Sequence, residues 1–503
     1  MNMKKTWKIV AIALLAIINV CPVMAGGILT NTNQNVAFLR NPARDGAIDI
    51  DGVYSNPAGV AFLKDGLHLS FNWQAAFQTR TIDTTSPFFA LGVKNNGAME
   101  KSFEGTSRAM FIPSLQAAYN KDKWSFQFNF AVTGGGGKCE FAEGLGSFEN
   151  AVGQIAAGLQ GLGVSNYDCA GYMQGKQYYF GFTMGAAYKI TENLSVYGGL
   201  RVLYGTASYK AKIYDIRVKT QNSDFQSFNN FLTDRMDNLK LTKYALEQAG
   251  ATATPTYQQV VGTLQKLDQL ESYRNGVNLI SNQNGTGVAP ILGADLKWGD
   301  FNFAVKYEFR TKMAMANEST VDKVYAIDAV NNYLDDSKIR EDQPSLLAFG
   351  VQYSPIEKVR INAGYHHFYD KNAKKTYYVN SVRYDNKNSQ LKKGTDEYLG
   401  GVEVDIAKKW TASAGFQITR YGNTDEFIND ISFVVNSWSF GLGAKYQVSD
   451  RLAVQAAFFQ TNYDKYTTQA VMVNDTKGNP IGISQNAFSR TNRVLAIGAN
   501  LDF

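Results

Sequence analysis

Residues 301–310 read FNFAVKYEFR, and this stretch decides the fold because aromatic or aliphatic side chains fill every second position. One face of the extended chain carries Phe, Phe, Val, Tyr and Phe, while the other carries Asn, Ala, Lys, Glu and Arg. A period of two is that of a β-strand between two different surroundings. Residues 194–204 and 491–503 repeat the pattern. In lipid all backbone N–H and C=O groups must be paired, so only a closed sheet can cross, and this alternation is typical of a transmembrane β-barrel.

About fourteen such runs follow one another from residue 66 to the terminal Phe503. We expect strands near 66–80, 107–119, 123–133, 176–190, 193–211, 287–298, 300–312, 343–354, 358–370, 395–407, 409–421, 432–447, 451–463 and 491–503. Short turns such as 120–123 and 448–450 occur at every second junction, so one rim is tight and the other elaborate. Aromatic residues gather at the tight rim, as an interfacial girdle would. A soluble β-sandwich also alternates, but it has no reason to combine these two features.

The first 65 residues lack strand alternation and divide into two parts. Residues 1–25 combine three lysines, the apolar stretch 9–20 and a small-residue site ending at Ala25, which indicates a secretory signal peptide. Cys21 does not indicate a lipoprotein, because Val20 stands where a small residue is needed. The segment 26–65 is too short to fold alone and must lean on the barrel formed by 66–503.

Charge and titratable residues exclude several classes of function. The signal peptide holds three of the six net positive charges, so the mature chain is near +3 and gives no reason to expect nucleic-acid binding. The three histidines are His68, His366 and His367, and the adjacent pair points to opposite faces of a strand. No nucleophile motif is present. We therefore expect no enzyme activity, no cofactor and no metal site.

Long outer connections are expected near 81–106, 134–175, 212–286, 313–342, 371–394 and 464–490. Apolar residues recur at helical spacing in 148–162, 225–239 and 260–270, so these loops should contain helices. The helices could pack on one another as a lid, or could also leave an apolar groove for a ligand. Cys139 and Cys169 share one outer connection and could form a disulfide there, or remain two separate thiols.

Residues 47–63 read AIDIDGVYSNPAGVAFL and directly precede the first strand. This stretch resembles the end of the hatch in the FadL family of outer-membrane transporters for long-chain fatty acids and other hydrophobic compounds, in particular at Asn56, Pro57, Ala58 and Gly59. The resemblance implies a barrel plugged by a hatch, helical outer loops that capture the ligand, and a kinked third strand that opens the wall sideways.

The third strand departs from that family because 123–133 contains no glycine, and the run Gly134, Gly135, Gly136 and Gly137 follows at its outer end. Four glycines can kink a strand, or can form a flexible loop base. For a ligand carboxylate, strand parity places Arg201, Arg310 and Lys312 in the lumen. The alternative is that lumen carboxylates such as Glu308 and Glu403 neutralise them.

These observations favour a transmembrane antiparallel β-barrel of about 14 strands with an N-terminal hatch and helical extracellular loops. The expected function is passive uptake of long-chain fatty acids or similar hydrophobic small molecules by a monomer in the outer membrane of a Gram-negative bacterium, surrounded by membrane lipid and lipopolysaccharide. Three alternatives are a surface receptor or adhesin using loops such as 212–286, an outer-membrane lipase and a general polar porin.

Overall fold

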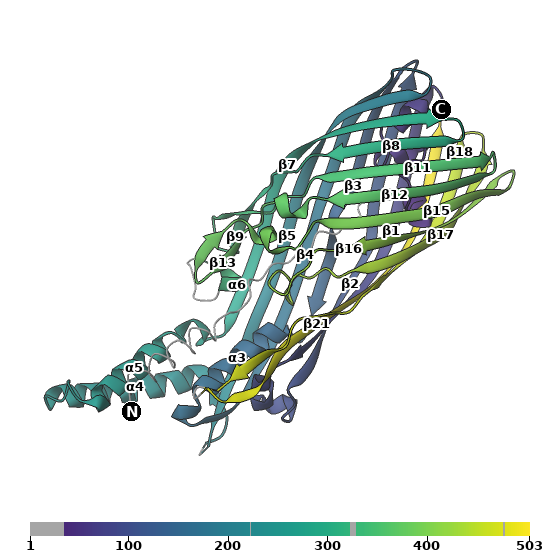
Figure 1. Cartoon of the computed structure of the whole chain (residues 1–503). Coiled ribbons are helices and arrows are strands. Elements are labelled where there is room, and N and C mark those ends of the chain that lie inside the picture. Colours follow the sequence, from purple (N-terminus) through teal and green to yellow (C-terminus); the bar gives the residue numbers. More distant parts are fainter. Residues whose placement is uncertain (1–34, 222, 322–327, 476–477) are drawn as a thin grey trace.

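A computed structural model describes residues 35–221, 223–321, 328–475 and 478–503. The expected signal peptide, its cleavage site and residues 26–34 lie outside this range. Fourteen long antiparallel strands close into a barrel, in which each strand pairs with its neighbours and the last strand pairs with the first (Figure 1). The expected all-β barrel fold is confirmed.

Seven of the fourteen barrel strands are longer than the sequence pattern indicated, mainly at their outer ends, and the other seven have the expected length or are shorter. They are β1 (Gly66–Thr85), β2 (Glu100–Lys121), β3 (Trp124–Phe141), β4 (Val164–Lys189), β5 (Leu194–Thr220), β7 (Val277–Trp298), β8 (Phe301–Glu308), β11 (Leu346–Ile356), β12 (Val359–Phe368), β15 (Thr395–Ala407), β16 (Trp410–Arg420), β17 (Ser437–Ser449), β18 (Leu452–Tyr463) and β21 (Pro480–Asp502). The tight turns and the C-terminus lie at one end of the barrel in Figure 1. Outer strand extensions therefore replace much of what the sequence assigned to loops.

The alternation along each strand sorts side chains between the outer surface and the lumen. In β8, Phe301 and Val305 are exposed on the outer face, while Asn302, Lys306 and Glu308 are buried. Apolar side chains on the outer face suit lipid, and polar side chains on the inner face can bond to whatever fills the lumen. The sheet thus supplies an apolar belt outside and a polar wall inside.

The outer connections fold over the elaborate rim as one lobe. Its helices are η3 (Pro87–Leu91), η4 (Val93–Asn95), α3 (Gly146–Gly158), η5 (Gln160–Leu162), α4 (Phe228–Gln248), α5 (Pro255–Asp268), η6 (Glu271–Tyr273), α6 (Asp328–Asn331), η7 (Asp370–Asn372) and η8 (Lys387–Gln390). Its short strands are β6 (Gln226–Ser227), β9 (Ala314–Ser319), β10 (Lys338–Arg340), β13 (Tyr377–Val379), β14 (Val382–Tyr384), β19 (Tyr466–Thr467) and β20 (Val471–Asn474). Helices α4 and α5 project beyond the barrel end opposite the tight turns.

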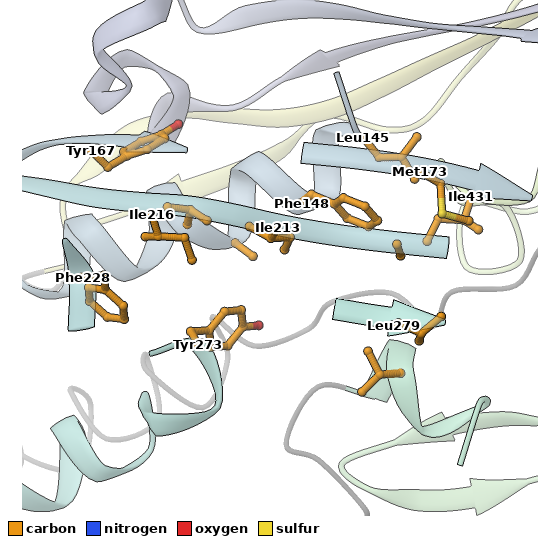
Figure 2. Packing of buried hydrophobic residues seen from close by; sticks show 14 of the residues in the cluster. Leu145, Phe148, Tyr167, Met173, Ile213, Ile216, Phe228, Tyr273, Leu279 and Ile431 are labelled. Carbon is orange, nitrogen blue, oxygen red and sulfur yellow. The ribbon is translucent and has the colours of Figure 1, made fainter. Parts of the chain in front are cut away.

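One apolar core holds this outer lobe together. Phe148 of α3, Met173 of β4, Ile213 of β5 and Phe228 of α4 pack in it with Tyr273 (Figure 2). The helical spacing of the loop sequences therefore matches real helices, and most of their apolar side chains pack within the lobe. No helix in the described ranges is both long and apolar enough to span a membrane.

The segment 35–65 lies inside the barrel, near the tight rim, and is called the hatch below. It contains α2 (Val36–Arg40), η1 (Ile50–Val53) and η2 (Gly59–Phe62). Several wall glycines let its backbone approach closely: a Cβ on Gly350 would collide with Gly46 N, and one on Gly441 would collide with Leu39 O. The hatch therefore sits directly against the inner wall.

Candidate functional site

The motif that ends the hatch is fixed to the barrel wall through Asn56. Its side-chain amide donates to Asp295 Oδ2 at 2.6 Å and to Ala47 O at 3.2 Å, and its Oδ1 accepts from Gly59 N at 3.1 Å. Asn302 also donates to Asp295 Oδ2, at 2.8 Å. One buried wall carboxylate therefore holds the turn that the sequence singled out.

The next two residues of the motif bond to two other strands. Gln127 of β3 donates to Pro57 O at 2.7 Å, and Ser195 of β5 donates to Ala58 O at 2.7 Å. Ala58 also packs against Tyr197 and Ile291. Backbone carbonyls in a buried site need such donors, so the wall is complementary to this turn.

Gly59 leaves no room for a side chain. A Cβ at this position would collide with the Asn56 amide and lie 2.9 Å from Asp295 Oδ2. The glycine is therefore needed for the bond between the hatch and Asp295.

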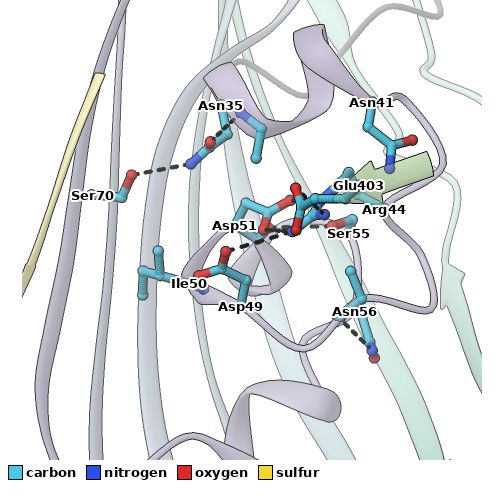
Figure 3. A network of polar contacts seen from close by, with 12 residues as sticks. Asn35, Asn41, Arg44, Asp49, Ile50, Asp51, Ser55, Asn56, Ser70 and Glu403 are labelled. Atoms are coloured by element: carbon cyan, nitrogen blue, oxygen red, sulfur yellow. Dashed lines mark hydrogen bonds and ion pairs between the residues drawn. The ribbon is translucent and has the colours of Figure 1, made fainter. Parts of the chain in front are cut away.

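Charged side chains fix the other half of the hatch (Figure 3). Arg40 is fully buried and donates to Glu403 Oε2 of β15 at 2.6 Å, and Arg360 reaches Glu403 Oε1 at 2.9 Å. Arg44 bonds Asp51 with two hydrogen bonds of 2.8 Å and lies 3.8 Å from Glu403. Glu403 is thus shared by three guanidinium groups, two of them on the hatch.

Asp49 adds a second charged contact between hatch and wall. Its carboxylate lies 3.6 Å from Lys445 Nζ and 3.7 Å from Arg44. Burial opposes ionisation, but these two cations hold the pKa of Asp49 below its ordinary value. The hatch therefore carries charges of both signs, and Arg40 and Asp49 pair with opposite charges of the wall.

Arg201, predicted for a ligand carboxylate, is occupied by the protein itself. It donates to both oxygens of Glu308, at 2.5 and 3.2 Å, and its guanidinium lies 5.0 Å from the Tyr54 ring. Lys306 also bonds Glu308, at 2.8 Å, and donates to Tyr54 O at 2.7 Å. Arg201 is therefore neutralised by Glu308, which was the alternative considered from the sequence. Lys306, the third member of this charged group, also bonds the hatch.

The other two predicted cations lie outside the lumen site. Arg310 donates to Asn372 O at 2.5 Å and lies 3.7 Å from Asp342. Lys312 is exposed while its neighbours Thr311 and Met313 are buried, so its predicted lumen position is wrong. Between the ladder pairs Ile291↔Glu308 and Asn284↔Ala316, β7 has six residues and the facing chain has seven, and this extra residue reverses the parity.

The barrel wall is interrupted between β2 and β3. Ladder pairs end at Ser107↔Cys139 and resume at Leu115↔Phe130, so residues 108–114 and 131–138 are not paired with each other. Over the same residues β2 stays paired with β1 and β3 stays paired with β4. Seven unpaired residues correspond to roughly 23 Å along the strand. We call this opening the wall gap.

The four glycines lie at the β3 side of the wall gap. Two bulges displace Thr133 and Gly136 from the ladder with β4, and Gly135 and Gly137 have φ of 98° and 74°. Left-handed backbone of this kind favours glycine. The run therefore bends β3 away from β2 instead of forming a loop base.

One cavity lies in the lumen, and a larger pocket lies in the outer lobe. A lumen cavity of about 80 Å³ is lined by Gln78, Ile112, Gly135 and Arg490, among others. Ile112 and Gly135 belong to the two edges of the wall gap, so this cavity adjoins the gap. A larger pocket of about 580 Å³ lies in the outer lobe, and it is lined by Lys94, Asn95, Ala98, Glu100, Lys101, Ala142, Glu143, Leu145, Phe148, Glu149, Cys169, Ala170, Gly171, Ile213 and Tyr214.

Cys139 and Cys169 are both free, so the disulfide considered from the sequence is not formed. Cys139 pairs with Gly175, and Cys169 is six residues further along the same strand. That separation is roughly 20 Å, whereas a disulfide needs Cα atoms within about 7 Å. Both thiols instead pack against the core of the outer lobe.

We expect the folded protein, isolated without reductant, to release two free thiols per chain on denaturation. The reason is that the strands hold the two sulfurs apart during and after folding. Thiol titration in denaturant measures the number directly. Fewer than one thiol per chain, with a mass two units lower, would contradict the separation.

The three histidines each bond a carboxylate. His68 contacts Asp502 at 2.6 Å, and His367 contacts Asp396 at 2.7 Å. His366 lies between Glu397 and hatch residue Asp45, both at 2.9 Å. In the part of the chain that is described, no histidine is hydrogen-bonded to a serine, and no group of three metal-ligating side chains occurs. Each imidazole is therefore held by acidic side chains of the barrel or the hatch.

Comparisons with known proteins agree with this architecture. No protein-family model and no curated protein sequence matches the chain. Among solved structures, a Pseudomonas aeruginosa FadL homologue matches with a TM-score of 0.60 and 12% identity, over 95% of this chain and 100% of that one. The Pseudomonas putida toluene transporter TodX matches with a TM-score of 0.52 and 11% identity, over 95% and 99%.

A TodX variant described as a monoaromatic hydrocarbon channel matches with a TM-score of 0.54 and 11% identity, over 94% of this chain and 100% of that one. These likenesses cover nearly the whole of both chains, including the closed barrel. At such low identity they establish the fold and not the substrate. The chain described here therefore has the fold of the FadL-type outer-membrane barrels.

Proposed function

We propose that this chain is a passive outer-membrane channel for small hydrophobic molecules that leave sideways through the wall gap. The observation that carries the proposal is the combination of a lumen filled by the hatch and a wall unpaired between β2 and β3 beside the lumen cavity. The solved barrels of similar fold include one described as a toluene transporter, which supports the same class of cargo.

An apolar molecule has a physical reason to take this route. Each methylene gains about 0.8 kcal/mol on leaving water, so release into lipid is favoured over release into a polar space. The tight-rim exit is filled by charged and amide groups of the hatch, whereas Met110 and Phe111 are exposed at the β2 edge of the gap. The wall gap therefore offers a short apolar exit that the hatch does not block.

In the finer form of the proposal, the pocket of the outer lobe captures the ligand and the hatch controls its passage. The hatch is held against the wall by hydrogen bonds, ion pairs and apolar contacts, so it can shift within the lumen without breaking a covalent bond. Long-chain fatty acids are the proposed cargo, and small aromatic hydrocarbons are the competing one.

Uptake by whole cells tests the proposal. Cells that lack their own hydrophobic-compound transporters would express this chain and receive labelled oleate or labelled toluene in separate experiments. We expect uptake above that of cells with an empty vector. If long-chain fatty acids are the cargo, this increase is expected for oleate. Surface-exposed, folded barrel without uptake of either compound would overturn the proposal, and uptake of toluene alone would replace the cargo.

We expect Gly59→Val to loosen the hatch. The new side chain displaces Asn56 from Asp295, and losing a hydrogen bond to a charged group costs about 1.5–3 kcal/mol. That cost corresponds to roughly a tenfold to hundredfold rise in the population of displaced hatches. Planar-bilayer conductance for small ions should rise accordingly.

Gly198→Val is the matched control, because a Cβ on Gly198 of β5 meets no atom within 4 Å. Conductance equal to that of the unchanged protein is expected for this variant. Equal conductance of Gly59→Val and Gly198→Val would show that the motif turn does not control the hatch.

A further inference from the structure

Two arginines, one buried and one partly buried, face each other in the lumen between the hatch and the outer lobe. Arg80 of β1 and Arg490 of β21 are direct partners in the strand ladder. Both follow the inward parity of their strands, in phase with the buried residues Ser70 and Asn492. The side chains of this arginine pair therefore enter the same part of the lumen.

Neither arginine has an acidic partner within the described ranges. Arg490 is 5% exposed, and its polar contact is to Gln78 Oε1 at 3.3 Å. The Nε atoms of both arginines are buried without a hydrogen-bond partner. Asp83 is three residues from Arg80 on β1, so its carboxylate lies on the opposite face of the strand. It is bonded to Lys465 at 2.8 Å.

An aromatic ring lies beside each arginine of the pair. The Arg490 guanidinium lies 4.9 Å from the Tyr463 ring, and that of Arg80 lies 5.8 Å from the Phe433 ring. Phe433 and Phe488 belong to the core of the outer lobe and are buried. The lumen cavity beside the pair is lined by neutral polar and apolar residues and, apart from Arg490, by no charged one. Two like charges repel each other there, and an anion between them relieves this cost.

We infer that Arg80 and Arg490 bind the carboxylate of an amphipathic ligand whose apolar part lies toward the wall gap. Arginine suits this role because its planar fork donates two parallel hydrogen bonds to a carboxylate. The inference rests on the proposed function, since it names the chemical class of cargo that the channel selects.

The lumen cavity has the size and position that such a headgroup needs. Its volume of about 80 Å³ holds two or three groups the size of a water molecule, each of which takes about 30 Å³. A carboxylate with one water fits, but an alkyl chain does not. Arg490 lines the cavity together with Ile112 and Gly135 of the wall gap, and Arg80 adjoins it as the ladder partner of Arg490. The tail would therefore point between β2 and β3.

The test compares two probes with the same tail. Labelled dodecanoate and dodecan-1-ol would be offered to cells expressing the unchanged chain or the double variant Arg80→Gln, Arg490→Gln. We expect dodecanoate uptake to fall at least tenfold in the double variant and dodecanol uptake to stay within twofold. The control is Arg493→Gln, which removes the same charge from an exposed position three residues away on β21.

Two other outcomes separate the carboxylate site from the channel function. Dodecanol uptake by the unchanged chain, with dodecanoate uptake equal in all variants, would overturn the carboxylate site and leave the channel function standing. No uptake of either probe by folded protein would overturn the channel function.

Equilibrium binding to purified protein in a neutral detergent tests the pair independently of transport. We expect the double variant to bind dodecanoate at least tenfold more weakly than Arg493→Gln does. Acetate supplies the carboxylate without a tail, and binding as tight as that of dodecanoate would reassign the pair to free anions. Equal dodecanoate binding by both variants would overturn the inference.

Discussion

Deleting Phe111, Thr133 and Gly136 together is expected to close the wall gap and to lower uptake of hydrophobic molecules at least tenfold. Between the flanking ladder pairs, β2 has seven residues, 108–114, while β3 has eight, 131–138. Removing one residue from β2 and two from β3 leaves six in each, so the ladder can pair throughout. Uptake and limited proteolysis of the barrel are the measurements.

The three deletions follow the irregularities of the sheet. Thr133 and Gly136 are the two residues displaced from the ladder with β4, and Phe111 lies in the bulge where β2 has one residue more than β1. Alternation is restored on both strands, so the inward positions of Ile112 and Cys139 are kept. Closing a gap adds backbone hydrogen bonds and should not destabilise the barrel.

A matched control deletes Thr252 and Ala253, which are exposed in the turn between α4 and α5. Its uptake should equal that of the unchanged chain. If the triple deletion folds, with heat resistance and surface exposure retained, and still takes up the cargo at the original rate, then the cargo does not leave through the wall gap.

Glu403→Gln is expected to release the hatch more strongly than any other single substitution in the lumen. The carboxylate is shared by Arg40, Arg44 and Arg360, and removing one partner of a buried ion pair costs about 3–5 kcal/mol. The hatch should become sensitive to protease added at the tight rim, and ion conductance should rise at least tenfold.

Asp405→Asn removes the same charge two residues away on β15 and is the control. Asp405 bonds Arg360 and Thr411, but the hatch arginines do not bond to it, and its side chain is 34% exposed. Surface ion pairs contribute about 1 kcal/mol or less, so this variant should keep the hatch in place. Equal protease sensitivity of the two variants would mean that Glu403 does not anchor the hatch.

The sequence predicted the elements that show a periodic pattern within one segment. It missed the features that depend on how two neighbouring strands pair. Fourteen strands and the loop helices follow from periods of two and near 3.6, which a single segment displays. The lumen position of Lys312 was wrong because one extra residue near Phe309 reverses the parity, and no local pattern marks it. The wall gap likewise requires counting residues on two strands at once.

The arginine pair also could not be predicted from individual strand segments. The first strand was expected to end at Arg80, and Arg490 was assigned to the connection 464–490. Both positions continue the inward parity of strands that run further outward than expected. Parity within 66–80 already placed Arg80 in the lumen, and extending the last strand back by one residue would have placed Arg490 there. Their pairing still needed the register between β1 and β21.

The long strands of the barrel raise the outer lobe above the part that would cross the membrane. β4 and β5 contain 26 and 27 residues, whereas a tilted strand crosses the hydrocarbon layer in about 9–11. The surplus of β5 raises the lobe by roughly 35 Å at a tilt near 45°. In the outer membrane proposed for this chain, that places the capture pocket within or above the carbohydrate layer of the outer leaflet. Poorly water-soluble molecules would then meet a protein surface before reaching the sugars that repel them.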